Sequence, residues 1–567
     1  MRCSAITNTQ SAPLSRLFSR GPRDRAMQRI TVTGDWLGRY TMYRMPHALA
    51  VVVTSTLLMS STQPVMVWAA DAPVADAAMH GDGDTVRALL ADGGDVNAAQ
   101  GDGMTALHWA AFRDDVVLAA ALIEADADIA PATRVGGITP LSMAATNGSV
   151  AMIDLLVEED ALVNWPTSTG ATPLMAAATS GRVDAVGRLL DHGAFVNARE
   201  TANGQTALMF AAWENRADAI RLLIGHGAHV GLTSLVMAMD ERRFDSDGNE
   251  LPRGRPRAPG ANSIMGGMTA LLFAARDGHL DATRALVEGG ANVDQVAGSE
   301  GSSPMVIAIA NGHYTVAKYL LDAGADPNVA NIDGLAPVYA TINMRFAPVS
   351  WAPNPRTDQE VVDALTLLSA LLDAGADPNT RIARRLWFSP TSHNRLWINP
   401  AGATPFWRAA QASDVESMRL LLAAGADANM ATFGGTTPLM VASGIGWRGN
   451  FSQNAPDSWM KAVHFLSELG ADVAVADDRG YTALHGAAAL GDNEMVEFLV
   501  ARGADVKAVN RAGDSAADMA FGPSRFFIPK PETANLLVEL GSPFQNNCRS
   551  DQCVDGKFFG GAETTQR

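Results

Sequence analysis

Histidine, cysteine and carboxylate side chains are the groups of this 567-residue chain that could do chemistry, and their spacing does not assemble a catalytic centre. None of the eleven histidines forms an i, i+4 pair with a third ligand in reach, which a zinc site would require. The chain also lacks the G-x-S-x-G, Walker-type and His-Glu-x-x-His motifs of nucleophilic, phosphate and zinc chemistry. The sequence therefore predicts no cofactor, no metal site and no catalytic residue.

Two segments keep a chemical alternative open. His393 lies in an irregular, arginine-rich stretch near Arg385, where an enzyme would have to place its active site. The segment 245–250, DSDGNE, resembles part of a calcium loop, but it lacks the third acidic position and the distant bidentate glutamate. A turn is the better interpretation of that segment.

Two of the three cysteines lie close together near the carboxyl end. Cys548 and Cys553 follow one another in a tail rich in Gly, Asn and Asp, whereas Cys3 stands near the amino terminus. In an oxidising compartment a small disulfide loop is the default for such a pair. A metal site would need further ligands, and the tail offers none nearby.

The structural element that would position such residues is a two-helix module, and residues 480–510 form one complete copy of it. Thr482 is placed to cap a first helix through its side-chain oxygen, and Gly491 allows the turn that ends it. A second helix begins near Asn493 and ends at Gly503, a residue free to adopt a positive φ. Asp505 and the residues after it suit a tight hairpin that leads to the next module.

The capping position of this module recurs along the chain. Seven of its ten successive gaps are 33 or 34 residues, and the other three contain insertions. A degenerate first copy begins near Ala72, so about twelve copies fill residues 72–545. The recurring positions are Thr105, Thr139, Thr172, Thr206, Thr269, Ser303, Ala336, Thr404, Thr437, Thr482 and Ser515. The period predicts an all-α solenoid whose stacked modules share one continuous core.

The repeated motifs resemble those of the ankyrin repeat family. The family's T-P-L-H motif appears as T-A-L-H at Thr105 and Thr482, and its G-A-D-x-N ending appears from Gly324, Gly375 and Gly425. The resemblance implies paired antiparallel helices joined by β-hairpin-like loops, in a protein of the bacterial, exported type. It also implies a non-catalytic scaffold that recognises another protein on its concave face, in which the motif histidines His108 and His485 stabilise their units.

The first 69 residues differ from the array. They carry eight Arg, no Lys and two Asp, followed by an apolar run over 48–59 and small residues at 67–69, a secretory signal pattern. We expect a leader at 1–69, the array at 70–547, a tail at 548–567, and export to the periplasm or outside the cell. An uncleaved membrane anchor is the alternative. Without the leader the net charge falls from −17 to −23, which argues against nucleic acids and anionic membranes as partners.

Four insertions interrupt the period, at about 232–264, 344–358, 381–401 and 444–458. The last three place tryptophan and arginine, the residues most enriched at binding hot spots, along the rim of one groove. We predict that this rim binds a protein; the alternatives are that the loops pack on the array, or that the tryptophans bind carbohydrate or cell wall. The predicted contact residues are Trp351, Trp387, Trp397, Trp407, Trp447, Arg384, Arg385, Arg395 and Arg448, with Arg345, Arg381 and Arg408 alongside.

Overall fold

The computed structural model divides into a part of residues 1–67 and a part of residues 68–567. The predicted leader and signal segment lie outside the described residues, and the second part holds the helices. The described residues are 72–238, 243–244, 250–251, 264–347, 355, 357–384, 386, 398–446, 455, 459–522, 528–545, 548–550, 553–554 and 557–558.

The described residues contain twenty-four α-helices that follow one another as twelve pairs, numbered here as units 1 to 12. The all-α solenoid of about twelve units is therefore confirmed. The pairs are α1 (Pro73–His80) and α2 (Gly83–Ala91), α3 (Ala106–Arg113) and α4 (Val116–Glu124), α5 (Pro140–Asn147) and α6 (Val150–Glu158), α7 (Pro173–Ser180) and α8 (Val183–Asp191), α9 (Ala207–Trp213) and α10 (Ala217–Gly225), α11 (Ala270–Arg276) and α12 (Leu280–Glu288), α13 (Pro304–Ala310) and α14 (Tyr314–Asp322), α15 (Pro337–Arg345) and α16 (Ala364–Asp373), α17 (Pro405–Gln411) and α18 (Val415–Ala423), α19 (Pro438–Ala442) and α20 (Trp459–Glu468), α21 (Ala483–Leu490) and α22 (Asn493–Ala501), and α23 (Ala516–Phe521) and α24 (Pro531–Glu539).

Capping residues and left-handed residues set the helix ends. Thr139 accepts a hydrogen bond from the backbone N–H of Ser142, and Pro140 fills the first helical position of α5, where no N–H is needed. Asp126 and Asp160 stand where most units have glycine after the second helix, and both take positive φ, 61° and 66°. Aspartate tolerates this region better than most residues, so both units keep the common turn.

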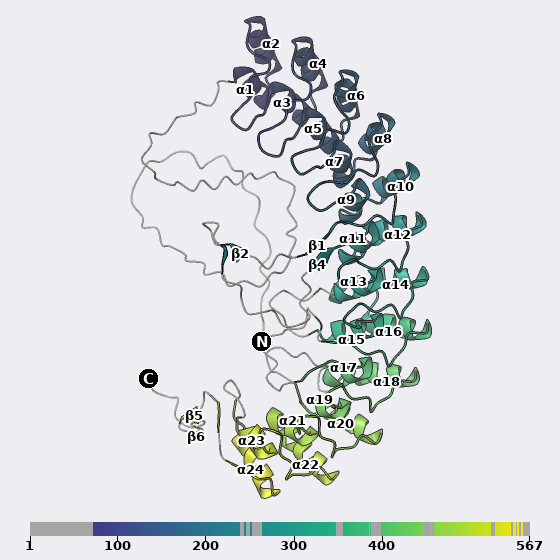
Figure 1. Cartoon of the computed structure of the whole chain (residues 1–567), viewed down its shortest axis with the longest axis vertical. Coiled ribbons are helices and arrows are strands. Elements are labelled where there is room, and N and C mark those ends of the chain that lie inside the picture. Colours follow the sequence, from purple (N-terminus) through teal and green to yellow (C-terminus); the bar gives the residue numbers. More distant parts are fainter. Residues whose placement is uncertain are drawn as a thin grey trace, which may run out of the picture. The chain divides into compact units, whose positions relative to one another are not determined.

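The helices form two layers within the array. Each odd-numbered helix packs against the next odd-numbered helix, and the even-numbered helices form a second layer beside them (Figure 1). Alanines such as Ala110 and Ala111 are fully buried and allow close approach within the odd-numbered layer. Leucines such as Leu156 and Leu189, also fully buried, fill the space between the layers, each contributing about 1.5–3 kcal/mol of transfer free energy. We call the odd-numbered layer the inner layer.

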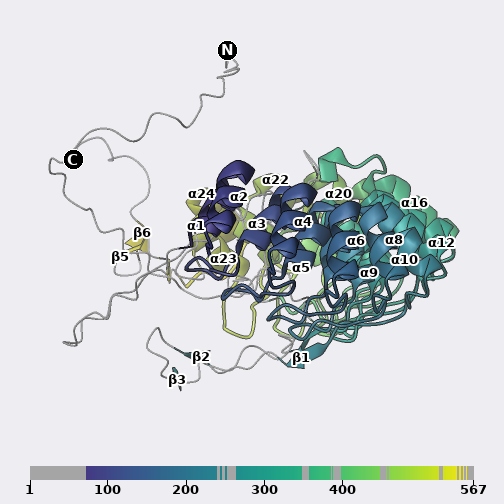
Figure 2. The ribbon, with the colours of Figure 1, turned by 90° about the horizontal axis from the view of Figure 1, so that it is seen from above.

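The hairpins between units project together from one side of the helices (Figure 2) and are linked by a row of backbone hydrogen bonds. The N–H of Arg134 donates to the carbonyl of Asp102 at 2.8 Å, and the same step recurs at each later junction. The row continues past the third insertion, where the N–H of Ala383 donates to the carbonyl of Asp333 at 2.7 Å. The insertions therefore extend loops and leave the row of hydrogen-bonded hairpins continuous.

The first insertion continues one of these hairpins as a ribbon. Strand β1 (Val236–Ala238) pairs antiparallel with β4 (Ile264–Gly266), and β2 (Arg243–Phe244) pairs with β3 (Glu250–Leu251) between them. The expected extended loop over 251–259 lies outside the described residues beyond Leu251. A last short pair, β5 (Cys553–Val554) and β6 (Lys557–Phe558), follows the array.

An asparagine after each of several second helices joins neighbouring units. The side chain of Asn197 donates to the carbonyl of Gly227 at 3.0 Å and accepts from the N–H of His229 at 2.9 Å. Asn164, Asn328 and Asn379 make the same two bonds to their next units.

We expect Asn197→Ala to lower the free energy of unfolding by about 1–2 kcal/mol, because two net hydrogen bonds are lost. Urea denaturation monitored by circular dichroism measures this. Asn203→Ala is the control, since the hydrogen bonds of this exposed residue run through its backbone. An equal loss in both variants would contradict a specific role for the asparagine bridge.

Candidate partner-binding surface

The inner layer has two side-chain positions per unit that point away from the core. They lie four and seven residues after the capping residue, so they share one face of the helix. In units 2 to 5 the first of these positions holds Trp109, Met143, Ala176 and Phe210, which are all partly exposed. We call the partly exposed residues Trp109, Phe112, Met143, Phe210 and Trp213 the inner-face strip.

Aromatic contacts organise both ends of the inner-face strip. Trp109 and Phe112 meet edge to face with ring centroids 5.8 Å apart, and the indole N–H of Trp109 donates to Gln100 at 2.9 Å. Trp213 stacks on Phe273 at 6.2 Å, and the guanidinium of Arg276 lies 5.8 Å and 5.1 Å from the two rings. The strip thus offers preorganised aromatic groups, which lose little conformational entropy when a partner covers them.

The first of these two positions is buried in the later units, whereas the second stays partly exposed at Arg276, Ala310 and Gln411. Phe273, Ile307 and Arg408 are 3%, 8% and 4% exposed, and Met519 is fully buried. Parts of the insertions pack here: Leu386 and Ile398 of the third are buried, and the N–H of Ala455 in the fourth donates to the carbonyl of Ala412 at 2.9 Å. The described ends of these insertions therefore pack on the array.

Trp407 is part of the core and cannot contact a partner. Its side chain is 1% exposed, and its indole N–H donates to the carbonyl of Thr436 in the next hairpin at 2.9 Å. The prediction that Trp407 binds a partner is therefore wrong. The reason is helical phase: Trp407 lies three residues after the cap Thr404, on the side that packs between units.

Two neighbouring arginines serve an internal network. Arg345 donates to both carboxylate oxygens of Asp414 at 2.9 Å and to Glu416 at 2.7 Å. Arg408 donates to the side-chain oxygen of Asn343 at 2.9 Å and to the carbonyl of Phe346 at 2.7 Å. Burial lowers the pKa of the Arg408 guanidinium. These contacts join the start of the second insertion to unit 9, so both guanidinium groups are already engaged within the protein.

The two remaining described arginines of the predicted rim are also engaged. Arg384 forms an ion pair with the fully buried Asp333. Arg381 lies over the ring of Phe433, with its guanidinium carbon 5.3 Å from the centroid. Each holds the third insertion to a neighbouring hairpin.

The other predicted site residues lie outside the described residues. Their part in binding stays a prediction, as does the catalytic alternative at His393 and the calcium-like turn over 245–249. The predicted contacts concerned are Trp351, Trp387, Trp397, Trp447, Arg385, Arg395 and Arg448.

Sequence reasoning missed the inner-face strip, although the repeat contains the signal. Counting four and seven residues from the caps Thr105 and Thr206 finds Trp109, Phe112, Phe210 and Trp213. The sequence does not show which of these positions stay open, because that depends on where the insertions pack.

The motif histidines are structural. The N–H of Thr105 donates to Nδ1 of His108 at 3.1 Å, so Nε2 carries the proton and donates to the carbonyl of Ile138 at 3.0 Å. His485 repeats this arrangement with Thr482 and the carbonyl of Asp514. Each ring therefore bridges its own helix cap to the following hairpin.

The burial of three histidines predicts that the free energy of unfolding of the array falls in mild acid. Burial lowers the pKa of His108, His279 and His485 below the ordinary value of about 6.5 that they regain on unfolding. The unfolded chain then binds more protons than the folded chain, so their contribution is complete above about pH 6.5 and is lost as the pH falls further. Urea unfolding between about pH 7 and pH 5 measures the slope. His485→Gln should show a smaller slope than the wild-type protein, and equal slopes in the two proteins would contradict the assignment.

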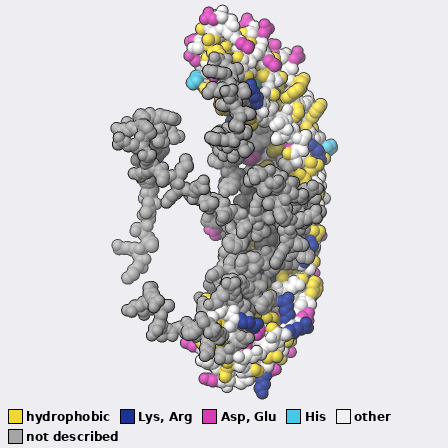
Figure 3. Space-filling model, turned by 60° about the vertical axis from the view of Figure 1, so that its left-hand side comes forward, with side chains coloured by type: hydrophobic (Ala, Val, Ile, Leu, Met, Phe, Trp, Pro, Cys, Tyr) yellow, Lys and Arg dark blue, Asp and Glu magenta, His cyan; other side chains and the backbone are white. Residues whose placement is uncertain are grey.

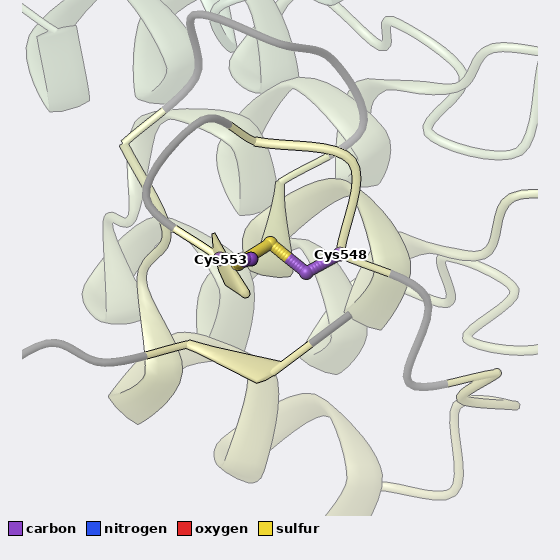
Figure 4. Close-up of a disulfide and its surroundings, with 2 residues drawn as sticks. All are labelled: Cys548 and Cys553. Atoms are coloured by element: carbon purple, nitrogen blue, oxygen red, sulfur yellow. A yellow bond between two sulfur atoms is a disulfide. The ribbon is translucent and has the colours of Figure 1, made fainter. Parts of the chain in front are cut away.

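Cys548 and Cys553 form a disulfide with Cα atoms 6.1 Å apart (Figure 4). Cys548 is 7% exposed, and the N–H of the next residue, Arg549, donates to the carbonyl of Gly522 at 3.0 Å. The disulfide loop therefore packs on the last unit of the array.

Among the described residues, no three His, Cys, Asp or Glu side chains gather in a way that could hold a metal ion. Each helix in that part of the chain is too short or too polar to cross a membrane.

A stack of helix pairs with a row of linked hairpins defines a helical repeat protein. Family models described as "Ankyrin repeats (3 copies)" match residues 74–167, 141–234 and 255–331, and models described as "Ankyrin repeat" match 401–433 and 479–511. Together they cover more than half of the sequence, and the chain belongs to the ankyrin repeat family.

Curated relatives share parts of the array. The ankyrin repeat and SOCS box protein 16 of Homo sapiens is 28% identical over 251 residues, 44% of this chain and 46% of the relative. A putative ankyrin repeat-containing protein of Treponema pallidum (strain Nichols) is 29% identical over 24% of this chain and 40% of the relative. The protein phosphatase 1 regulatory subunit 27 of Mus musculus is 38% identical over 71 residues, 12% of this chain and 46% of the relative. Each relative is matched over less than half of its length. Ankyrin repeats point to a protein–protein interaction scaffold, and proteins of this family are generally non-catalytic.

Proposed function

We propose that the protein is a non-catalytic scaffold that binds another protein through the inner-face strip of units 2 to 5. One observation carries the proposal: the outward position four residues after the cap is partly exposed in units 2 to 5 and buried in units 6 to 12. The open positions hold two tryptophans and two phenylalanines, the kind of aromatic anchors that dominate interfaces. The insertion rim, with Trp387 and Trp397, would extend this concave surface.

Photo-crosslinking in the cell that makes the protein tests the proposal. A benzophenone amino acid replaces Phe112, which is 53% exposed in the strip, or Phe195, which is 67% exposed after α8. We expect a specific crosslinked protein from position 112 and none from position 195. The same products from both positions, or products from position 195 alone, would refute binding at the strip.

We further propose that the signal segment directs export of the chain and is then cleaved. The arginine-rich, apolar start of the sequence supports this proposal, and the Cys548–Cys553 disulfide fits an oxidising compartment. Mass spectrometry of the natural protein tests it: a new amino terminus near residue 70 and a closed disulfide are expected. An intact leader would favour the membrane-anchored alternative.

A further inference from the structure

We infer that the partner presents a cationic segment with apolar anchors to units 1 to 3, at the amino-terminal end of the inner-face strip. The inference rests on the proposed function and names the chemistry of its partner. Two independent features of the described residues carry it, the charge of these units and the apolar groups that their surface leaves exposed.

The first units carry a strong excess of negative charge. Residues 72–170 contain fifteen Asp and Glu but three Arg and no Lys, whereas residues 171–233 contain five of each sign. Figure 3 shows carboxylates gathered at this end of the array. A surface of one sign attracts a segment of the opposite sign and speeds its association.

Two of the three arginines in these units are bound to backbone. Arg113 donates to the carbonyl of Met79 at 3.2 Å, and Arg134 donates to the carbonyl of Gly101 at 3.0 Å. Arg87 is paired with Asp84 on the outer helix α2 at 2.6 Å. Arg113 and Arg134 thus hold neighbouring units together, and the fifteen carboxylates against three guanidinium groups leave a large negative excess for a partner to neutralise.

Apolar groups lie beside this charge. Phe112 is the penultimate residue of α3, and the residues that follow it line an open depression between units 1 and 2. Val117 at this depression is 74% exposed. The residues lining the depression are Gly81, Arg113, Asp114, Asp115, Val116 and Val117. A side chain with an apolar stem and a cationic head, such as lysine or arginine, suits this mixture.

A hydrogen-bonded chain links the negative charge to the strip itself. The carboxylate of Asp76 accepts from Gln100 at 2.6 Å, and Gln100 accepts from the indole of Trp109 at 2.9 Å. Asp76 lies on α1 at the position equivalent to Trp109 on α3, four residues after the cap. The row of outward positions therefore begins with a carboxylate and continues with the apolar side chains of Trp109 and Met143. An extended segment with a cationic residue followed by apolar residues matches this order.

Binding of designed peptides to the full chain tests the inference. Three pools share fixed Trp and Leu positions and are long enough to span several units; their other positions hold Lys and Arg, Asp and Glu, or Ser and Gln. Fluorescence anisotropy measures their affinities at low and raised salt. We expect the cationic pool to bind most tightly and to lose affinity as salt rises.

Charge-neutralising variants localise the effect. Asp76→Asn together with Asp114→Asn removes both charges but keeps one side-chain oxygen at each position, and should weaken the cationic pool by about three- to tenfold. The matched control, Glu158→Gln with Glu159→Gln, removes two exposed charges at the end of the outer helix α6 and should leave binding unchanged. Equal effects of the two variants, or cationic binding no tighter than that of the other pools, would overturn the inference.

A separate readout distinguishes this failure from failure of the proposed function. If an acidic or uncharged pool binds best and Phe112→Ala weakens it, the strip is a binding surface and the inferred partner chemistry is wrong. If Phe112→Ala changes the affinity of no pool, the strip itself is not the binding surface, and both proposals fall.

Discussion

Trp407→Ala is expected to lower the free energy of unfolding by about 3–5 kcal/mol, the largest stability effect we predict for one residue. Trp407 is the largest fully buried side chain of the described residues. The substitution opens a cavity between units 9 and 10 and also leaves the carbonyl of Thr436 without its indole donor. Chemical denaturation, with hydrogen exchange to locate the opening, measures the loss.

The control for this prediction is another tryptophan. Trp165 is 44% exposed in the loop after α6, so Trp165→Ala should cost much less, about 1 kcal/mol or below. We expect hydrogen exchange in the Trp407→Ala variant to rise first in α17 to α20, because each unit of a solenoid depends on its neighbours. Equal losses in the two variants would contradict the core position of Trp407.

Phe112→Ala combined with Trp213→Ala is expected to weaken binding of the crosslinked partner by about 100-fold, corresponding to about 2.7 kcal/mol. The two residues stand at equivalent positions near the two ends of the strip and are partly exposed, so the fold should be kept. Titration calorimetry with the purified partner measures the affinity, and circular dichroism checks the fold.

The matched control replaces one phenylalanine and one tryptophan elsewhere. Phe195→Ala with Trp165→Ala removes the same two side-chain types from loops that follow the outer helices α8 and α6. Binding by this control should equal that of the wild type. A loss of affinity as large as that of the strip variant would show that general aromatic exposure, rather than the inner-face strip, determines binding.

The repeat made the fold predictable from sequence. The caps Thr105, Thr139 and Thr172 follow one another at the common spacing, and each fixes where a helix begins. The two units that lack the usual glycine after the second helix are predictable as well, since Asp126 and Asp160 adopt the left-handed conformation that this position requires. Helix caps and left-handed turns depend on residues that are close in sequence, so they can be predicted from one sequence.

The surface depends on contacts between residues far apart in sequence. Arg345 and Asp414 are 69 residues apart, and Arg408 and Phe346 are 62 apart. No period predicts that these arginines bind within the protein rather than to a partner. Counting from the caps could have found the inner-face strip, but only the burial of Phe273 and Ile307 shows that the first outward position is covered from unit 6 onward.

The packing of the insertions on part of the inner layer has a consequence for binding. A groove open along all twelve units would expose a long apolar surface, which in a soluble protein invites nonspecific association. Packing parts of the insertions on units 8 to 10 limits the open face to a shorter stretch. The aromatic groups of units 2 to 5 are partly exposed on this stretch, which is the surface that we propose a partner binds.

Hydroxyl-radical footprinting of the complex between this chain and its crosslinked partner tests the central claim most directly. Trp109, Met143, Phe210 and Trp213 are oxidisable and partly exposed, whereas Phe195 and Trp165 are exposed away from the strip. The account predicts that the partner protects the first four residues and leaves the last two as reactive as in the free protein. Unchanged oxidation of the four strip residues, with protection elsewhere on the array, would contradict it.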